Sequence, residues 1–145
     1  VHGLLTDWSR QLAGDPFVDT FGTTSACIYG EGCGAGIQKG GDQYGPTHFR
    51  AFAIKIGKWW LAPENVNDIC RTLGLQQAPH IGTGTLEWGI QRVQEGTLHT
   101  MIGPQPGVHL MEGLIAVPEV PLLTRSGDRI IVKLKHKDLY NDNSE

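Results

Sequence analysis

Residues 129–135 read Arg-Ile-Ile-Val-Lys-Leu-Lys, and the alternation of charged and apolar side chains predicts a β-strand. Because residues two apart in a strand point the same way, Lys133 and Lys135 emerge together, with Leu134 on the other face. Paired lysines on a rigid strand with an apolar back suit a triphosphate. The alternative is an edge strand that exposed lysines protect from aggregation.

The charge distribution sets this segment apart from the rest of the chain. The net charge is -3, but residues 1–124 hold seven basic and eleven acidic groups, whereas residues 125–137 hold five basic and one acidic. A short basic segment in an otherwise acidic chain favours a local phosphate site over a broad nucleic-acid-binding face.

Length and composition indicate a single domain. The chain has 145 residues, of which 39% are hydrophobic, enough for one packed domain or part of one. No run of 18 apolar residues and no signal-peptide pattern occurs, so we expect neither a membrane segment nor targeting. Three cysteines without a Cys-x-x-Cys pair argue against disulfides and structural zinc and favour a cytoplasmic setting.

Outward from the basic strand, apolar periodicity predicts a mixture of helices and short strands. Residues 30–45 contain seven glycines in sixteen positions, which predicts a loop. The expected strands are 27–29, 49–56, 114–117 and 129–134. The expected helices are an amino-terminal one containing Leu4 to Leu12, one from Pro63 closed by Gly74, and one that Thr85 caps and that stops before Gly96.

Two acidic residues stand beside glycines at points where ligands often bind. Glu112 directly precedes an apolar strand, and Gly113 leaves room for a ligand to approach. A carboxylate there can hold magnesium, which takes oxygen ligands. Glu31, at the mouth of the glycine-rich loop, is a similar case. Taken singly, each Glu-Gly pair usually marks a turn.

Other fingerprints are absent from the sequence. Neither the P-loop pattern nor Gly-x-Gly-x-x-Gly occurs, and the six histidines lack metal-ligand spacing. The tryptophans can stack on bases or form core and cleft walls. They are Trp8, Trp59, Trp60 and Trp88.

The order and spacing of four short motifs resemble the lysine-AMP nucleotidyltransferases, and most closely the phage-type ATP-dependent RNA ligases. The four motifs lie within residues 28–39, 49–54, 112–115 and 133–138. The resemblance implies an α+β fold with antiparallel sheets and packed helices, similar to the ATP-grasp-like adenylation domain of RNA and DNA ligases. Residues 1–138 would then form a partial nucleotidyltransferase domain, and residues 139–145 a polar tail.

The resemblance also implies roles for individual side chains. Glu31 would bind the ribose, Phe49 or Phe52 would pack on adenine, and Glu112 would serve the metal. Lys133 and Lys135 would hold the α-phosphate. ATP and magnesium are thus the implied cofactors, and the implied partners are RNA 5′-phosphate and 3′-hydroxyl ends, as in RNA repair.

Two departures from the family pattern bear on catalysis. The nucleophilic lysine of the family lies in Lys-x-Asp-Gly, which does not occur in this sequence. Ala53 stands where the family usually has aspartate. The chain also opens at Val1 without methionine, so we expect a fragment of a longer ligase, or a chain whose partner supplies the missing amino-terminal part. A noncatalytic nucleotide- or RNA-binding or structural module and an unrelated α+β domain are the alternatives.

Overall fold

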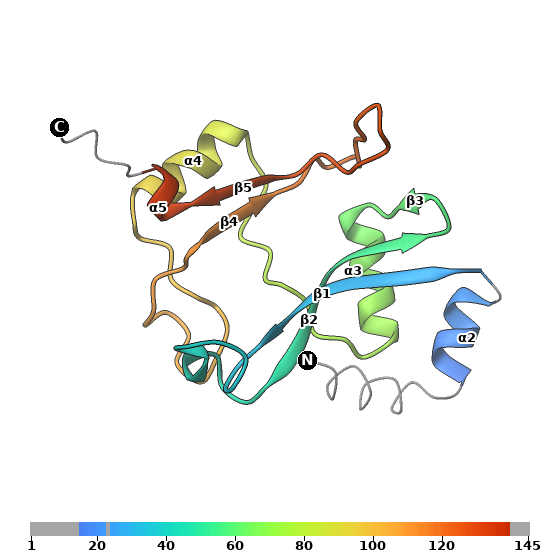
Figure 1. Ribbon diagram of the computed structural model, residues 1–145, viewed down its shortest axis with the longest axis horizontal. Coiled ribbons are helices and arrows are strands. Elements are labelled where there is room, and N and C mark those ends of the chain that lie inside the picture. Colours follow the sequence, from blue (N-terminus) through green and yellow to red (C-terminus); the bar gives the residue numbers. More distant parts are fainter. Residues whose placement is uncertain (1–14, 23, 140–145) are drawn as a thin grey trace. The chain divides into compact units, whose positions relative to one another are not determined.

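The computed structural model of the protein describes residues 15–22 and 24–139 (Figure 1). The chain forms two compact units, Val1–Pro79 and His80–Glu145. In both units antiparallel strands pack with helices, so the predicted α+β class is confirmed. The helix predicted around Leu4 to Leu12 lies outside the described residues.

The first unit contains a three-stranded antiparallel sheet. Its strands, in spatial order, are β1 (Ala26–Cys33), β2 (His48–Ile56) and β3 (Trp59–Trp60). Its helices are α2 (Asp15–Phe21), α3 (Pro63–Thr72) and the 3₁₀ helix η1 (Gly41–Tyr44).

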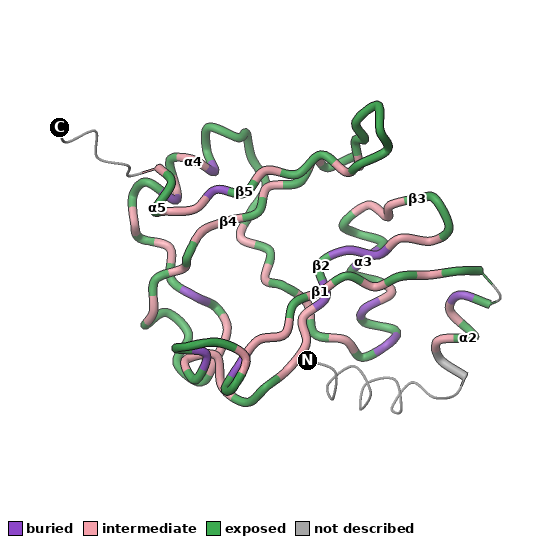
Figure 2. Tube along the Cα trace, in the orientation of Figure 1, coloured by how far each residue is buried: buried purple, intermediate pink, exposed green. Residues whose placement is uncertain are grey.

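Helix α3 forms as its sequence predicts and covers one face of this sheet. Pro63 occupies its first turn, and Val66, Cys70 and Leu73 are buried at helical spacing. These side chains join Ile54 of β2 in the core of the first unit. The buried segments of α3 and β2 are visible in Figure 2.

Strand β1 is longer than predicted, because Gly30 to Cys33 belong to it rather than to a loop. The ring of Phe49, from β2, lies over Gly30, and a Cβ at that position would collide with the ring. Gly30 therefore marks a close approach between strands, which is a known use of glycine inside a strand. Glycine content alone led to the wrong prediction for these four residues.

The second unit consists of a two-stranded antiparallel ribbon packed on helices. The elements are α4 (Leu86–Gln94), β4 (Gly113–Ala116), β5 (Val132–Lys135) and α5 (His136–Leu139). The cap predicted for α4 is confirmed, because Thr85 Oγ1 accepts a hydrogen bond from the Trp88 amide at 3.2 Å. Strand β5 is shorter at its start than predicted, since Arg129 pairs instead with Leu123 in an isolated bridge.

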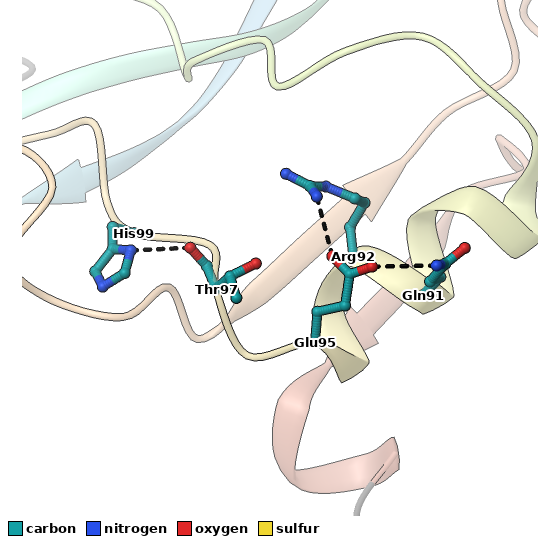
Figure 3. Close-up of polar contacts among 5 residues, drawn as sticks. All are labelled: Gln91, Arg92, Glu95, Thr97 and His99. Atoms are coloured by element: carbon teal, nitrogen blue, oxygen red, sulfur yellow. Dashed lines mark hydrogen bonds and ion pairs between the residues drawn. The ribbon is translucent and has the colours of Figure 1, made fainter.

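Side-chain contacts hold the end of α4 and the segment after it (Figure 3). Glu95 accepts hydrogen bonds from Arg92 Nη1 at 3.0 Å and from Gln91 Nε2 at 3.1 Å. His99 Nδ1 donates to the Thr97 carbonyl at 2.9 Å. These local bonds join residues of the last turn of α4 and of the segment directly after it.

Candidate functional site

The β4–β5 ribbon presents the two predicted lysines on one face. Lys135 pairs with Gly113 and Lys133 with Ile115 in the antiparallel register. Leu134, between the lysines, is buried and packs against Gly89 of α4. The predicted division of this strand into a charged face and an apolar face is therefore confirmed for these residues.

Glu112 and Lys135 are in direct contact. Lys135 Nζ donates to Glu112 Oε1 at 3.1 Å, and the Glu112 side chain is 71% exposed. The backbone carbonyl of Glu112 accepts from the His136 amide at 3.1 Å, which holds the Glu112 backbone beside the end of β5. Exposed ion pairs contribute only about 0–1 kcal/mol. Both groups can therefore exchange this contact for a ligand at little cost.

Gly113 has a different role from the one expected. A Cβ at Gly113 would collide with the backbone of Leu134 and Lys135. The space beside Glu112 that we expected to admit a ligand is thus occupied by β5, and the glycine permits close strand pairing.

A cavity of about 250 Å³ adjoins Glu112 in the second unit. This is below the roughly 300–1,000 Å³ typical of pockets that enclose a small-molecule ligand. It is lined by Val93, Gly96, Leu98, Leu110, Met111, Glu112, Gly113, His136 and Lys137. Because most of these side chains are apolar, the cavity does not by itself form a site for a triphosphate.

In the first unit, Glu31 faces a basic residue across the sheet. Glu31 pairs with Arg50 of β2, and Cys33 is the next residue of β1 on the same face. Burial raises the pKa of the Cys33 thiol, the negative charge of Glu31 raises it further, and the positive charge of Arg50 lowers it. The three side chains therefore share one electrostatic environment.

Arg50 is held in place by two hydrogen bonds. Its Nε donates to His48 Nε2 at 3.0 Å, and its Nη1 donates to the Gln77 carbonyl at 2.7 Å. His48 Nδ1 lies 2.7 Å from the Pro46 carbonyl, an acceptor, so this nitrogen carries the proton and Nε2 is left to accept. The resemblance assigned Arg50 no role. Only the register with β1, which the sequence does not show, places it opposite Glu31.

The two candidate adenine-binding residues occupy different environments. Phe49 covers Gly30 and packs against the core of the first unit. Phe52 is 44% exposed and lies at a register shift, where Tyr29 pairs with Ala53 and Gly30 pairs with the residue before Phe52. An extra residue at such a bulge projects away from regular pairing. Phe52 is thus the more accessible ring.

The predicted residues therefore fall into two groups. Glu112, Lys133 and Lys135 lie together in the second unit, whereas Glu31 and Phe52 lie in the first. That both groups line one ATP pocket remains a prediction.

Within residues 15–22 and 24–139, no three His, Cys, Asp or Glu side chains are grouped so as to hold a metal ion by themselves. In the same ranges, no helix has the length and apolar character needed to cross a membrane.

The described residues thus form an antiparallel α+β structure in which two lysines of β5 lie beside the carboxylate of Glu112. The sequence matches the RNA ligase family over residues 4–135, nearly the whole chain. The chain therefore belongs to the RNA ligase family. Among individually curated proteins, no sequence matches it.

Proposed function

We propose that this chain binds ATP or AMP with magnesium and serves as the nucleotide-binding part of an ATP-dependent RNA ligase. The observation that carries the proposal is the contact between Glu112 and Lys135, with Lys133 on the same strand face, in a chain of the RNA ligase family. One carboxylate and two ammonium groups supply the charges needed to hold a metal-bound phosphate.

In this proposal the second unit binds the phosphate end of the nucleotide. Lys133 and Lys135 would neutralise the α-phosphate, and Glu112, which here pairs with Lys135, would hold the magnesium. Magnesium commonly uses one or two protein carboxylates and takes its other ligands from phosphate and water. A single carboxylate is therefore sufficient, and the metal would supply further neutralisation of charge on phosphorus.

The first unit would bind the nucleoside. Glu31 accepts hydrogen bonds from the ribose hydroxyls, and the exposed ring of Phe52 packs on adenine. We assign adenine to Phe52 because Phe49 already packs on Gly30 and the core. Arg50, fixed opposite Glu31, holds positive charge beside the carboxylate.

The complete reaction needs a nucleophile that these motifs do not contain. In the family reaction a lysine attacks ATP, AMP passes to an RNA 5′-phosphate, and an RNA 3′-hydroxyl displaces AMP. No Lys-x-Asp-Gly occurs here, so we propose that another segment of a longer protein, or a partner chain, supplies the lysine. Lys133, Lys135 and the metal act by neutralising and positioning phosphate.

Calorimetric titration of the chain with ATP and magnesium tests the binding proposal. We expect saturable binding that weakens at least about tenfold in the Lys133→Ala/Lys135→Ala double variant, because the phosphate loses two charge-assisted contacts. Arg125→Ala is the matched control, since it removes an exposed positive charge of the same unit from outside β5. Absence of ATP binding by the unmodified chain would refute the proposal.

The enzyme assignment has a separate test. The gene sequence upstream of Val1 should encode Lys-x-Asp-Gly, and the protein that includes it should form a covalent AMP adduct and seal RNA ends. An upstream sequence without this tetrapeptide would remove the enzyme assignment and leave the binding proposal intact.

A second candidate function is a noncatalytic module that binds nucleotide or RNA ends. The observation in its favour is Ala53, which is 2% exposed and places a buried methyl group where the family usually has aspartate. This alternative predicts ATP binding by the longer protein without AMP transfer. Formation of an AMP adduct by that protein would exclude it.

A further inference from the structure

An aromatic and basic surface extends along the sheet face of the first unit that carries Glu31. The rings of Tyr29 and Trp60 have centroids 4.8 Å apart, with planes at 43°. Lys55 Nζ lies 5.3 Å from the centroid of the Trp60 ring, in the range of a cation–π contact. The two rings and the ammonium group thus form a continuous cluster, which we call the aromatic platform.

The aromatic platform lies on the sheet face opposite α3. Tyr29 and Glu31 are two residues apart on β1, so their side chains share a face. Ile54 and Ile56 of β2 flank Lys55 and pack into the core with α3 on the other face. Tyr29 remains 37% exposed, which leaves aromatic surface accessible to a ligand.

The hairpin that supplies Lys55 and Trp60 is basic in sequence, which favours a polyanion. Residues 43–63 contain no aspartate or glutamate and three basic residues, Arg50, Lys55 and Lys58. Residues 1–79 as a whole hold six basic and seven acidic residues. The β2–β3 hairpin is therefore a basic segment of a unit that is otherwise slightly acidic.

We propose that Tyr29, Trp60 and Lys55 bind unpaired RNA bases next to the ribose position at Glu31. Aromatic rings stack on any base, and lysine adds attraction for the backbone, so the site would bind single-stranded RNA with little sequence preference. Tyr29 and Glu31 are about 7 Å apart along β1, so the aromatic platform adjoins the proposed ribose position. The inference rests on the proposed function, because it places the RNA end beside the nucleotide.

Binding of a short fluorescein-labelled oligouridylate, followed by fluorescence anisotropy, tests the aromatic platform in the 145-residue chain. Trp60→Ala is expected to weaken binding about fivefold or more, and Trp60→Phe to retain most of it. Lys55→Gln, which leaves both rings in place, should weaken binding and reduce its salt dependence. Thermal melts confirm that each variant is folded.

The hairpin itself supplies a matched control. Trp59 is 79% exposed and adjacent to Trp60, but alternation along β3 directs it to the other face. Trp59→Ala therefore removes an exposed indole without altering the aromatic platform and should leave RNA binding unchanged. Arg71→Ala removes an exposed positive charge from α3 and controls for charge alone.

The same samples are titrated with ATP and with the labelled strand annealed to its complement. Two results together support the aromatic platform. Trp60→Ala and Lys55→Gln weaken binding of the single strand but not of ATP, and the unmodified chain binds the duplex more weakly than the single strand. The aromatic platform is overturned if the unmodified chain binds no RNA, as a protein-docking face would predict. Duplex binding as tight as single-strand binding, equal losses in Trp59→Ala, or an equal loss of ATP affinity would also overturn it. RNA binding without ATP binding would refute the proposed nucleotide site and leave the aromatic platform standing.

Discussion

Phe49 and Phe52 show how the surroundings of a residue decide its role. Both lie in one motif and both are phenylalanine, yet Phe49 fills the space above Gly30 whereas Phe52 is 44% exposed. Phe52 lies at the register shift between β1 and β2, where the cross-strand pairing passes over it. The two rings therefore differ in how much aromatic surface each leaves accessible to a ligand.

Alanine substitutions should distinguish the roles of Phe49 and Phe52. Phe52→Ala is expected to weaken ATP binding with little change in melting temperature, because it removes an exposed ring. Phe49→Ala is expected to lower the free energy of unfolding by up to about 3 kcal/mol, since it opens a void over Gly30. Calorimetry and denaturant unfolding measure the two effects. Loss of stability in Phe52→Ala, or loss of ATP binding alone in Phe49→Ala, would reverse the assignment.

The reactivity of Cys33 reports on Glu31 and Arg50. Burial and the charge of Glu31 raise the pKa of the thiol, so less thiolate is present at neutral pH than for a free cysteine. Glu31→Gln removes one cause of the rise and should speed alkylation by iodoacetamide. Arg50→Ala removes the opposing effect and should slow it. Peptide mass spectrometry measures the rate of Cys33 alkylation at a series of pH values. An unchanged rate in both variants would contradict the proximity of Cys33 to Glu31 and Arg50.

At the scale of elements, the β4–β5 ribbon depends on Gly113. A side chain at this position would meet the β5 backbone at Leu134 and Lys135. Gly113→Ala is therefore expected to lower the melting temperature and to weaken ATP binding, because it separates Glu112 from Lys135. Ala116→Gly, in the same strand, controls for backbone flexibility. Wild-type stability and ATP affinity in Gly113→Ala would show that the strands do not pair as closely as described.

Helices and strands with strong periodicity were predictable, and those defined by contacts were not. Pro63, the buried spacing of α3 and the Thr85 cap are local signals, and both helices begin where the sequence indicates. The four residues Gly30 to Cys33 were assigned wrongly because the ring that covers Gly30 comes from another strand. The short strand β3 and helix α5 were also missed, since each has too few residues for periodicity to be visible.

In the candidate site too, the local pattern was predictable from the sequence and the contacts between distant residues were not. Alternation in residues 132–135 placed Lys133 and Lys135 on one face, which the structure confirms. The contact between Glu112 and Lys135 joins residues 23 positions apart, and no local pattern encodes it. The position of Arg50 opposite Glu31 depends on strand register, which a bulge shifts.

At the scale of the whole molecule, exposed apolar side chains indicate limited stability in isolation. In the second unit many large apolar side chains are more than one third exposed, including Ile115, Val117, Val120, Leu122, Leu123, Ile130 and Ile131. Apolar surface of this extent usually contacts a partner or promotes association. We expect thermal unfolding of the chain to be broad and dependent on protein concentration. A sharp, cooperative melt that is independent of concentration would contradict this expectation.

We propose that Glu31 in the first unit and Glu112, Lys133 and Lys135 in the second bind one molecule of ATP. Hydrogen exchange of the backbone amides, with and without ATP and magnesium, tests it most directly because each segment is observed separately. We expect ATP to slow exchange in β1 and β2 and, at the same ATP concentration, in β4 and β5. Protection confined to one unit, or absent from both, would contradict it.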